Sequence, residues 1–324
     1  MLNKPRRLDW LNTRNLRVFL PSIIVVIVLL VLGQSLAAGF VSVKNMSSIL
    51  MTASILIFAM IAQSIVMISG NNGIDLSVGA VMSMTALLGP TLPMGTPLTF
   101  ALAILAVMGM GAVCGLLNGA GIQFFKIPPL IMTLIMSNVI YGFTMFSTKG
   151  QPSLNLGPLL LSVSKPVLPL LRVLTLIGIA AVIAAEIVLL KTRVGRTLMI
   201  AGDNPTAANL CGVKIGLVSV LAYASAGAIS GFAGLMLVGY AGSAIIKMAD
   251  GYTLLSIAAA IIGGTSIAGG RGSFVGGALG AMVLVILNSI LQVLRMPEGA
   301  RYIIQGTLLA VILLTNTRSA KLRQ

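Results

Sequence analysis

Long apolar segments recur along almost the entire chain and are separated by short polar loops. A helix needs about 20 residues to cross the hydrocarbon core of a bilayer. Ten segments approach or exceed that length, at residues 18–36, 47–69, 76–89, 97–117, 128–147, 170–190, 215–240, 251–268, 274–294 and 302–316. Hydrophobic residues make up 57% of the chain and charged residues 8%, whereas soluble domains carry about 25% charged residues. We therefore expect an all-α polytopic membrane protein, with residues 1–324 forming one transmembrane domain.

The basic residues predict how this domain is oriented. If the amino terminus is cytoplasmic, only seven of the 21 lysines and arginines lie outside or at the outer ends of spans: Lys44, Lys149, Lys165, Arg172, Lys247, Arg295 and Arg301. This excess has the direction of the positive-inside rule. It predicts a cytoplasmic basic arm at 1–17, a cytoplasmic loop at 191–214 and a cytoplasmic tail at 317–324. The first apolar segment also resembles a cleavable signal peptide, but the arm before it is long for one, so we expect an uncleaved span.

Composition excludes several classes of function. The net charge of +15 is scattered over short loops and forms no basic face, so we expect no nucleic-acid partner. The chain has no histidine, and its two cysteines, Cys114 and Cys211, are far apart, which argues against a metal site, a redox pair or a histidine-based catalytic triad. No G-x-x-x-x-G-K-[ST] phosphate loop occurs. We expect no catalytic residue and no cofactor in this chain.

Two segments depart from plain spanning helices. Ser69–Pro90 and Ala241–Gly277 both place glycines, hydroxyls and one aspartate, Asp75 or Asp250, at the head of a short apolar stretch. They open the third and eighth spans, which suggests a repeat unit of five spans. Because five is an odd number, the second copy of such a unit would insert into the membrane with the opposite orientation, as an inverted repeat. Interrupted helices at matching positions of an inverted repeat indicate a transport site, because freed backbone groups are tolerated where they line a cavity. The alternative is that these glycines only permit close helix packing.

The polar loop at 191–214 predicts a short helix of its own. Asn204 suits a helix cap, Pro205 suits the first helical position, and Gly212 can supply a left-handed residue at the end. We expect a two-turn helix over Pro205–Cys211. It is either a docking device for a soluble partner or only a capped connection between two spans.

Three separated motifs carry a resemblance to a known family. They are GIDLSVG at Gly73–Gly79, AGDNPTAANLCGVKI at Ala201–Ile215 and IIGGTSIAGGRGSFVGGALGA at Ile261–Ala281. The chain resembles the permease subunits of bacterial ribose-type sugar ATP-binding-cassette (ABC) importers. One departure is that Asn71 and Asn72 separate Gly70 from Gly73, where the family commonly has Ser-Gly-Gly-Ile-Asp.

The resemblance implies an architecture and partners. It implies a type II importer-like fold of about ten helices in the bacterial inner membrane, paired with a second permease copy or paralogue. Cytoplasmic ATP-binding subunits would bind ATP and magnesium, and a periplasmic solute-binding protein would deliver the cargo. The coupling helix that sits on the ATPase would comprise Asp203, Asn204, Pro205, Thr206, Ala207, Ala208, Asn209, Leu210, Cys211 and Gly212. We expect the small face of Ala207, Ala208 and Cys211 to enter a groove of the ATPase.

Polar residues in the spans suggest the cargo. Neutral amides and hydroxyls, with Asp75, form the candidate pathway for an uncharged hydroxylated solute: Gln63, Asn71, Asn72, Asp75, Ser77, Asn118, Asn138, Ser256, Thr265 and Asn288. The same aspartate is expected to cap a helix beginning at Leu76. Glu186 either pairs with Lys191 or Arg193 or snorkels at the interface.

Three other functions fit the same composition. A branched-chain amino acid ABC permease has a related architecture and would be separated by uptake assays with sugars and leucine. A self-contained secondary transporter or channel would work without an ATPase. A structural membrane scaffold would transport nothing.

Overall fold

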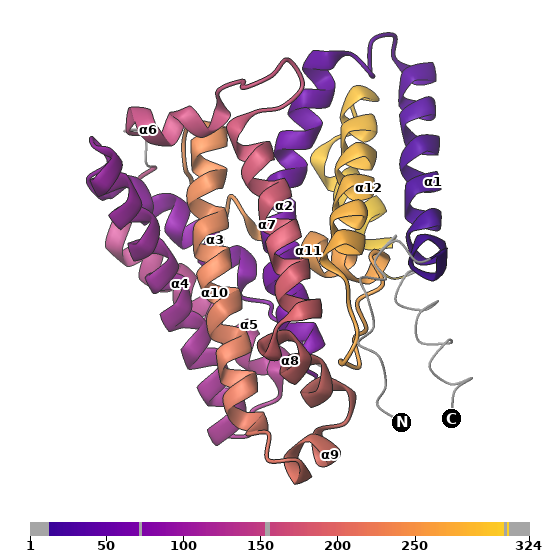
Figure 1. The fold of residues 1–324 in the computed structure, drawn as a ribbon. Coiled ribbons are helices and arrows are strands. Elements are labelled where there is room, and N and C mark those ends of the chain that lie inside the picture. Colours follow the sequence, from indigo (N-terminus) through magenta and orange to yellow (C-terminus); the bar gives the residue numbers. More distant parts are fainter. Residues whose placement is uncertain (1–12, 71–72, 153–155, 308–309, 311–324) are drawn as a thin grey trace.

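The computed structural model describes residues 13–70, 73–152, 156–307 and 310, and every regular element within these ranges is helical. The helices form one bundle (Figure 1). Their bounds are α1 (Thr13–Leu36), α2 (Val43–Ile68), α3 (Val78–Leu88), η2 (Gly89–Thr91), α4 (Pro97–Phe124), α5 (Pro129–Thr148), α6 (Pro158–Leu161), η3 (Ser162–Ser164), α7 (Val173–Lys191), α8 (Arg193–Asp203), α9 (Pro205–Leu210), α10 (Ile215–Ala241), α11 (Asp250–Ile262) and α12 (Phe274–Val293). Residues 298–307 are also helical.

Seven of the described helices are long and apolar enough to cross a membrane: α1, α2, α4, α5, α7, α10 and α12. They correspond to seven of the ten predicted spans. The third and eighth predicted spans are the short helices α3 and α11. The tenth, predicted at 302–316, lies partly outside the described residues, so the count of ten stays a prediction.

Two predicted loop segments differ from the structure. The basic arm predicted at 1–17 is shorter, because α1 already begins at Thr13, while residues 1–12 lie outside the described part. The loop predicted at 191–214 contains a further helix, α8, before the expected one. Thr192 caps α8 by accepting the Gly195 N–H at 3.2 Å. The predicted tail at 317–324 lies outside the described residues.

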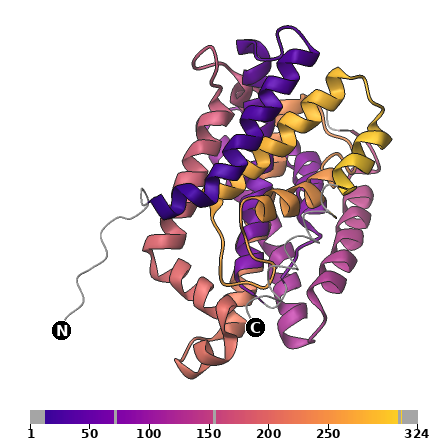
Figure 2. The ribbon, with the colours of Figure 1, turned by 90° about the vertical axis from the view of Figure 1, so that its right-hand side faces the viewer.

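Helix α2 forms the centre of the bundle. It packs against α7, α10, α11 and α12, and 83% of its most apolar window is buried inside the protein. By contrast, α1 lies at the outside against α12, as Figure 2 shows. A helix that is apolar all round and buried on all sides is typical of the core of a membrane bundle.

Glycines bring α4 and α10 into backbone contact. Gly111, Gly115 and Gly119 recur every four residues on α4 and face the equivalent stripe of α10. A Cβ atom on Gly115 would lie 2.0 Å from the Tyr223 carbonyl oxygen, and one on Gly227 would lie 2.1 Å from the Gly111 oxygen. Small residues at this spacing allow two membrane helices to approach closely. Close packing of helices on glycine thus also occurs at α4 and α10, outside the two segments for which the sequence suggested it.

The bundle has two distinct ends. Figure 1 shows α6 at the upper end, and α8 and α9 at the lower end. We call these the α6 end and the α9 end. The two segments that connect α5 to α7 and α7 to α10 thus emerge at opposite ends, as the sequence predicted.

Candidate functional site

The short helices α3 and α11 begin side by side. The Gly79 N–H of α3 donates to Thr253 Oγ1 of α11 at 3.0 Å, and a Cβ atom on Gly79 would lie 2.6 Å from the Ala249 carbonyl oxygen. The Ala249 N–H in turn donates to Ser83 Oγ at 3.1 Å. This contact joins the first turns of two helices from different halves of the chain.

From this contact the two helices run to opposite ends of the bundle. The chain after α3 reaches the α6 end, where a Cβ atom on Gly157 would lie 3.1 Å from Met94 Cβ. The chain after α11 reaches the α9 end, where Gly269 contacts Gly70 and Gly202. Two half-length helices whose amino termini meet inside the bundle are the arrangement in which transport sites form.

Asp75 stabilises the turn that precedes α3, whereas the sequence predicted that it caps the helix itself. Its Oδ1 accepts the Ser77 N–H at 2.8 Å and the Ser77 hydroxyl at 2.6 Å. The helix begins at Val78 with Ser77 at its cap position, two residues later than predicted. Asp75 therefore fixes the turn before the helix and does not cap a helix beginning at Leu76.

Side chains of neighbouring helices form hydrogen bonds with the remaining polar groups of this extended segment. Asn118 Nδ2 donates to Ser77 Oγ at 2.9 Å. The Gln63 amide, oriented with its nitrogen toward the Asp75 carbonyl oxygen, donates to it at 3.0 Å and accepts the Asp75 N–H at 3.2 Å. Ser137 Oγ donates to the Leu76 oxygen at 2.9 Å. Backbone groups freed by the break are thus paired inside the protein, as a bilayer requires.

A cavity of about 570 Å³ opens beside the start of α11. Polar side chains from α5, α11, the connection before α11 and the helix at 298–307 line it: Ser137, Asn138, Tyr141, Lys247, Asp250, Thr253, Tyr302 and Gln305. The Tyr141 hydroxyl donates to Asp250 Oδ1. Lys247 Nζ lies 5.1 Å from the centre of the Tyr141 ring, a cation–π distance. An aromatic face, a carboxylate and an ammonium group therefore share one wall.

Most of the predicted pathway residues lie elsewhere. Asn138 lines this cavity, and Asn288 lines a neighbouring one of about 160 Å³. The others that the structure describes are buried: Gln63, Asp75, Ser77, Asn118, Ser256 and Thr265. Of these, Thr265 Oγ1 has no hydrogen-bond partner among the described residues, and neither has Asn118 Oδ1. Asn71 and Asn72 lie outside the described residues.

The sequence does not mark Tyr141, Lys247 and Asp250 as pathway residues, although Asp250 matches Asp75 in its place before a short apolar stretch. Two features of the sequence could have indicated these residues. Tyr141 places a phenol inside the predicted span 128–147, and Lys247 and Asp250 place two opposite charges three residues apart just before the predicted span 251–268.

The helix predicted in the polar loop is confirmed as α9. Asn204 Oδ1 accepts the Ala207 N–H at 2.9 Å, Pro205 is the first helical residue, and Gly212 has φ of 84°. The helix ends at Leu210, one residue earlier than predicted.

The predicted small-residue face of this helix is wrong at one position. Ala208 is 0% exposed because it packs against its own chain, so its methyl group does not belong to the free face. Ala207 and Cys211 are exposed, and Leu210 is 84% exposed. The free surface of α9 therefore centres on Leu210 and Ala207.

Glycines connect the start of α9 to both interrupted segments. A Cβ atom on Gly202, at the end of α8, would lie 2.0 Å from the Ile68 oxygen and 3.1 Å from the Gly70 nitrogen. One on Gly269 would lie 2.5 Å from Gly70 Cα and 2.9 Å from the Gly202 oxygen. The Gly270 N–H donates to the Ile68 oxygen at 3.0 Å. We call Gly70, Gly202, Gly269 and Gly270 the glycine junction.

Glu186 has a structural role that neither sequence interpretation anticipated. It is 6% exposed and accepts the Phe274 N–H at 2.7 Å, the Val275 N–H at 3.3 Å and the Ser273 hydroxyl at 3.1 Å. The carboxylate thus binds the amino terminus of α12, where the helix dipole favours negative charge. Snorkelling is wrong for this residue, because its carboxylate is buried.

Comparison with known proteins identifies relatives over nearly the whole chain. Residues 22–313 match the family described as "Branched-chain amino acid transport system / permease component". The chain is 28% identical to the ribose import permease protein RbsC of Escherichia coli (strain K12), over 92% of this chain and 93% of that protein. It is 30% identical to the autoinducer 2 import system permease protein LsrC of Shigella flexneri, over 92% and 86% respectively.

A third relative covers still more of the chain. This is the galactose/methyl galactoside import permease protein MglC of Escherichia coli (strain K12), 29% identical over 95% of both proteins. No solved structure gives a significant match.

Proposed function

This chain belongs to the permease family of branched-chain amino acid transport systems, and from that membership we propose that it is the membrane-spanning permease subunit of an ABC importer for a sugar or sugar-like solute. The relatives that suggest this cargo import ribose, autoinducer 2 and galactose or methyl galactoside. ATP hydrolysis belongs to a separate subunit, in keeping with the lack of a phosphate loop in this sequence.

The observation that carries this proposal is the cavity beside the start of α11, where Thr253 both lines the cavity and accepts the hydrogen bond from Gly79 of α3. Its wall offers a carboxylate, an amide and hydroxyls, which can exchange hydrogen bonds with a polyhydroxylated solute, and the Tyr141 ring can pack on the apolar face of a sugar. The two helices that meet there run to opposite ends, so a relative movement would open the site to one end or the other. The inverted repeat of the two halves is part of this proposal.

Energy would enter through α9. A partner ATPase that binds the exposed Leu210 and Ala207 would displace α8 and α9 when it closes on ATP. Gly202 would pass that displacement to Gly70 and Gly269, because backbone packed on backbone has no flexible side chain to absorb it. Gly70 precedes the segment that leads into α3, and Gly269 follows α11.

The partners and the orientation follow from this mechanism. The α9 end faces the cytoplasmic ATP-binding subunits in the bacterial inner membrane, with both chain termini on that side, and the α6 end faces a periplasmic solute-binding protein. Leu134 of α5, Leu254 of α11 and Tyr302 line this cavity and are exposed. A second permease copy or paralogue packed on this face would close the cavity from that side. Residues 1–324 would act as one domain with its coupling loop at 191–214.

The Lys247 and Asp250 pair supports a second candidate cargo. A zwitterionic amino acid needs one cationic and one anionic partner, and both lie on the wall of this cavity. The family description also names branched-chain amino acid transport. The two candidates differ in whether the cargo itself is charged.

Uptake competition separates the two cargoes. Cells expressing the permease with its ATPase and binding protein should accumulate labelled ribose or galactose, and unlabelled sugar should compete while leucine does not. Competition by leucine alone would establish the amino acid function. Accumulation that persists without any ATPase subunit would indicate a self-contained transporter.

A further inference from the structure

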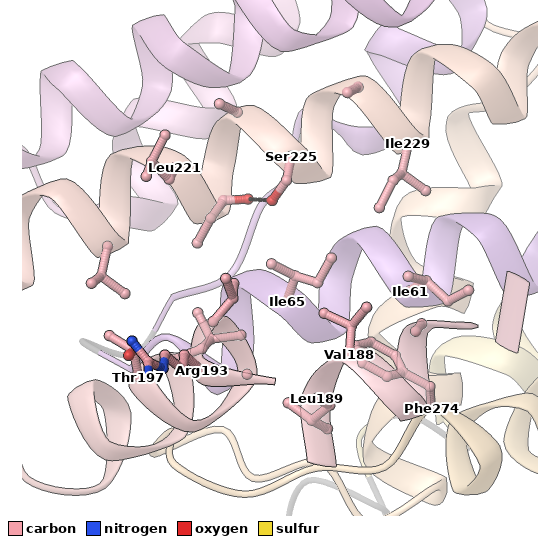
Figure 3. Close-up of a pocket in the computed structure, with 18 of the residues that line it drawn as sticks. Ile61, Ile65, Val188, Leu189, Arg193, Thr197, Leu221, Ser225, Ile229 and Phe274 are labelled. Carbon is pink, nitrogen blue, oxygen red and sulfur yellow. Dashed lines mark hydrogen bonds between the residues drawn. The ribbon is translucent and has the colours of Figure 1, made fainter. Parts of the chain in front are cut away.

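A second, larger cavity separates the two helices on either side of the α8–α9 segment. It measures about 810 Å³ and lies between α10 on one side and α7 with α8 on the other (Figure 3). Ile61 and Ile65 of α2 form part of its wall, and both α7 and α10 pack against α2. The cavity therefore occupies the space between the two helices that the coupling movement must displace.

Its walls are almost entirely apolar. Three of the lining side chains are polar: Arg193, Thr197 and Ser225. Ser225 Oγ already donates to the Ala222 carbonyl oxygen at 2.9 Å. Apolar cavities of this kind exclude water, and this one offers too few polar groups for a sugar. Hydrocarbon is the chemistry that fits it.

The polar residues are placed unevenly. Figure 3 shows Arg193 and Thr197 at one end of the cavity, with Ile61 and Phe274 at the other. Arg193 is exposed and belongs to the first turn of α8, at the α9 end of the bundle. No carboxylate is among the lining residues that the structure describes. Glu186, one turn before Leu189 on α7, is bound to the amino terminus of α12.

We propose that this cavity binds one acyl chain of an anionic phospholipid, whose phosphate pairs with the guanidinium of Arg193. The apolar walls select the acyl chain. Arg193, the one cation among the described residues that line the cavity, selects a phosphate whose headgroup carries no compensating cation. In the orientation proposed above, the lipid comes from the cytoplasmic leaflet. A chain seated there fills the gap between α7 and α10 and resists their approach, so lipid composition regulates coupling.

Lipid retention tests this proposal directly. The full-length permease is reconstituted in nanodiscs of equal parts phosphatidylglycerol and phosphatidylcholine, extracted mildly, and analysed by native mass spectrometry for bound lipid. The native chain should retain phosphatidylglycerol in preference to phosphatidylcholine. Arg193→Gln should lower phosphatidylglycerol retention about fivefold, the effect of one basic residue near an anionic lipid surface.

Two further variants separate the cavity from the general surface. Arg196→Gln removes the same charge from α8 at an exposed position that does not line the cavity, and should retain phosphatidylglycerol like the native chain. Ser225→Phe fills the cavity from α10 and should lower retention of both lipids.

Three results would overturn the proposal. Equal retention of the two lipids by the native chain would exclude selection by Arg193. Equal losses in Arg193→Gln and Arg196→Gln would assign the effect to surface charge. Native dimers that lack bound lipid and are lost in Ser225→Phe would show that a second copy of the chain occupies the cavity.

Discussion

At the residue scale, hydrogen bonds to Asp75 explain how an extended segment can interrupt an apolar bundle. Asp75 is 2% exposed, and its carboxylate accepts two hydrogen bonds from Ser77. The Gln63 side-chain amide pairs with both the N–H and the carbonyl oxygen of the Asp75 backbone. The sequence predicted that Asp75 is buried with partners, because an aspartate at membrane depth is costly. The sequence did not reveal that the carboxylate binds the turn before α3 and not the first turn of the helix. The residue at which α3 begins depends on tertiary contacts from Asn118 and Ser137.

Substitution of Asp75 should therefore affect the fold before it affects cargo. Asp75→Asn keeps an acceptor oxygen, whereas Asp75→Ala and Asp75→Leu leave the Ser77 N–H and hydroxyl unsatisfied, at a cost of about 1–3 kcal/mol for each buried group. We expect the asparagine variant to keep more folded protein and more transport than the other two. The thermal unfolding midpoint and uptake are measured together. Equal values for the three variants would argue against a structural role for this carboxylate.

The Tyr141 hydroxyl gives a prediction about cargo. Tyr141→Phe keeps the ring but removes the donor to Asp250, which changes the hydrogen bonds available on the cavity wall. We expect uptake at low substrate concentration to fall about 10- to 150-fold, because a hydrogen bond to a charged group contributes about 1.5–3 kcal/mol. Tyr240→Phe is the matched control, since Tyr240 contacts Thr52 and does not line this cavity. The same loss of uptake in both variants would contradict a specific role for Tyr141.

At the scale of elements, short helices and glycine contacts determine what can move. The sequence indicated the places of α3 and α11 through clustered glycines and aspartates, and it gave the cap and first residue of α9. It missed α8, because that helix lies within a loop between two spans and has no long apolar run. The burial of Ala208 was also beyond sequence reasoning, since a helix of six residues shows no periodicity that identifies its inner face.

Contact between α4 and α10 should be intolerant of side chains at its glycines. Gly115→Val places a Cβ atom 2.0 Å from the Tyr223 carbonyl oxygen, which is far inside van der Waals contact, so the helices must separate. Overpacking costs about 1–3 kcal/mol or more, and we expect a lower unfolding midpoint and lower abundance. Gly109→Val on the same helix is the control, because a Cβ atom there meets nothing within 4 Å. Equal stability of the two variants would refute the packing argument.

Arginine substitutions on α9 should separate docking from folding. Ala207→Arg and Leu210→Arg place a charge on the exposed face, so they should abolish co-purification of the ATPase while leaving permease abundance unchanged. Ala208→Arg should instead lower abundance, because its side chain is buried in its own chain. Pull-down from membranes with matched permease levels is the measurement. Normal ATPase binding by both exposed variants would show that α9 is not the coupling contact.

At the scale of the whole molecule, the proposed coupling face and the proposed cargo cavity are separate, and backbone contacts join the segments that carry them. The α9 helix lies at one end of the bundle, and the cavity lies beside the start of α11. The glycine junction connects the segment before α9 to the segments that precede α3 and follow α11. The sequence predicted the short helix of the polar loop and the two interrupted segments as separate motifs, but of the predicted pathway residues that the structure describes only Asn138 lines the cavity. Their connection depends on three loops distant in sequence, so only the folded structure reveals it.

ATP-driven uptake tests this account most directly. Proteoliposomes containing the permease and its ATPase are loaded with ATP on the α9 side, and binding protein with labelled ribose or galactose is supplied on the α6 side. We predict accumulation that requires ATP hydrolysis, persists when ion gradients are collapsed, and disappears in Leu210→Arg while permease abundance is unchanged. Accumulation without the ATPase, or uptake unaffected by Leu210→Arg, would contradict the account.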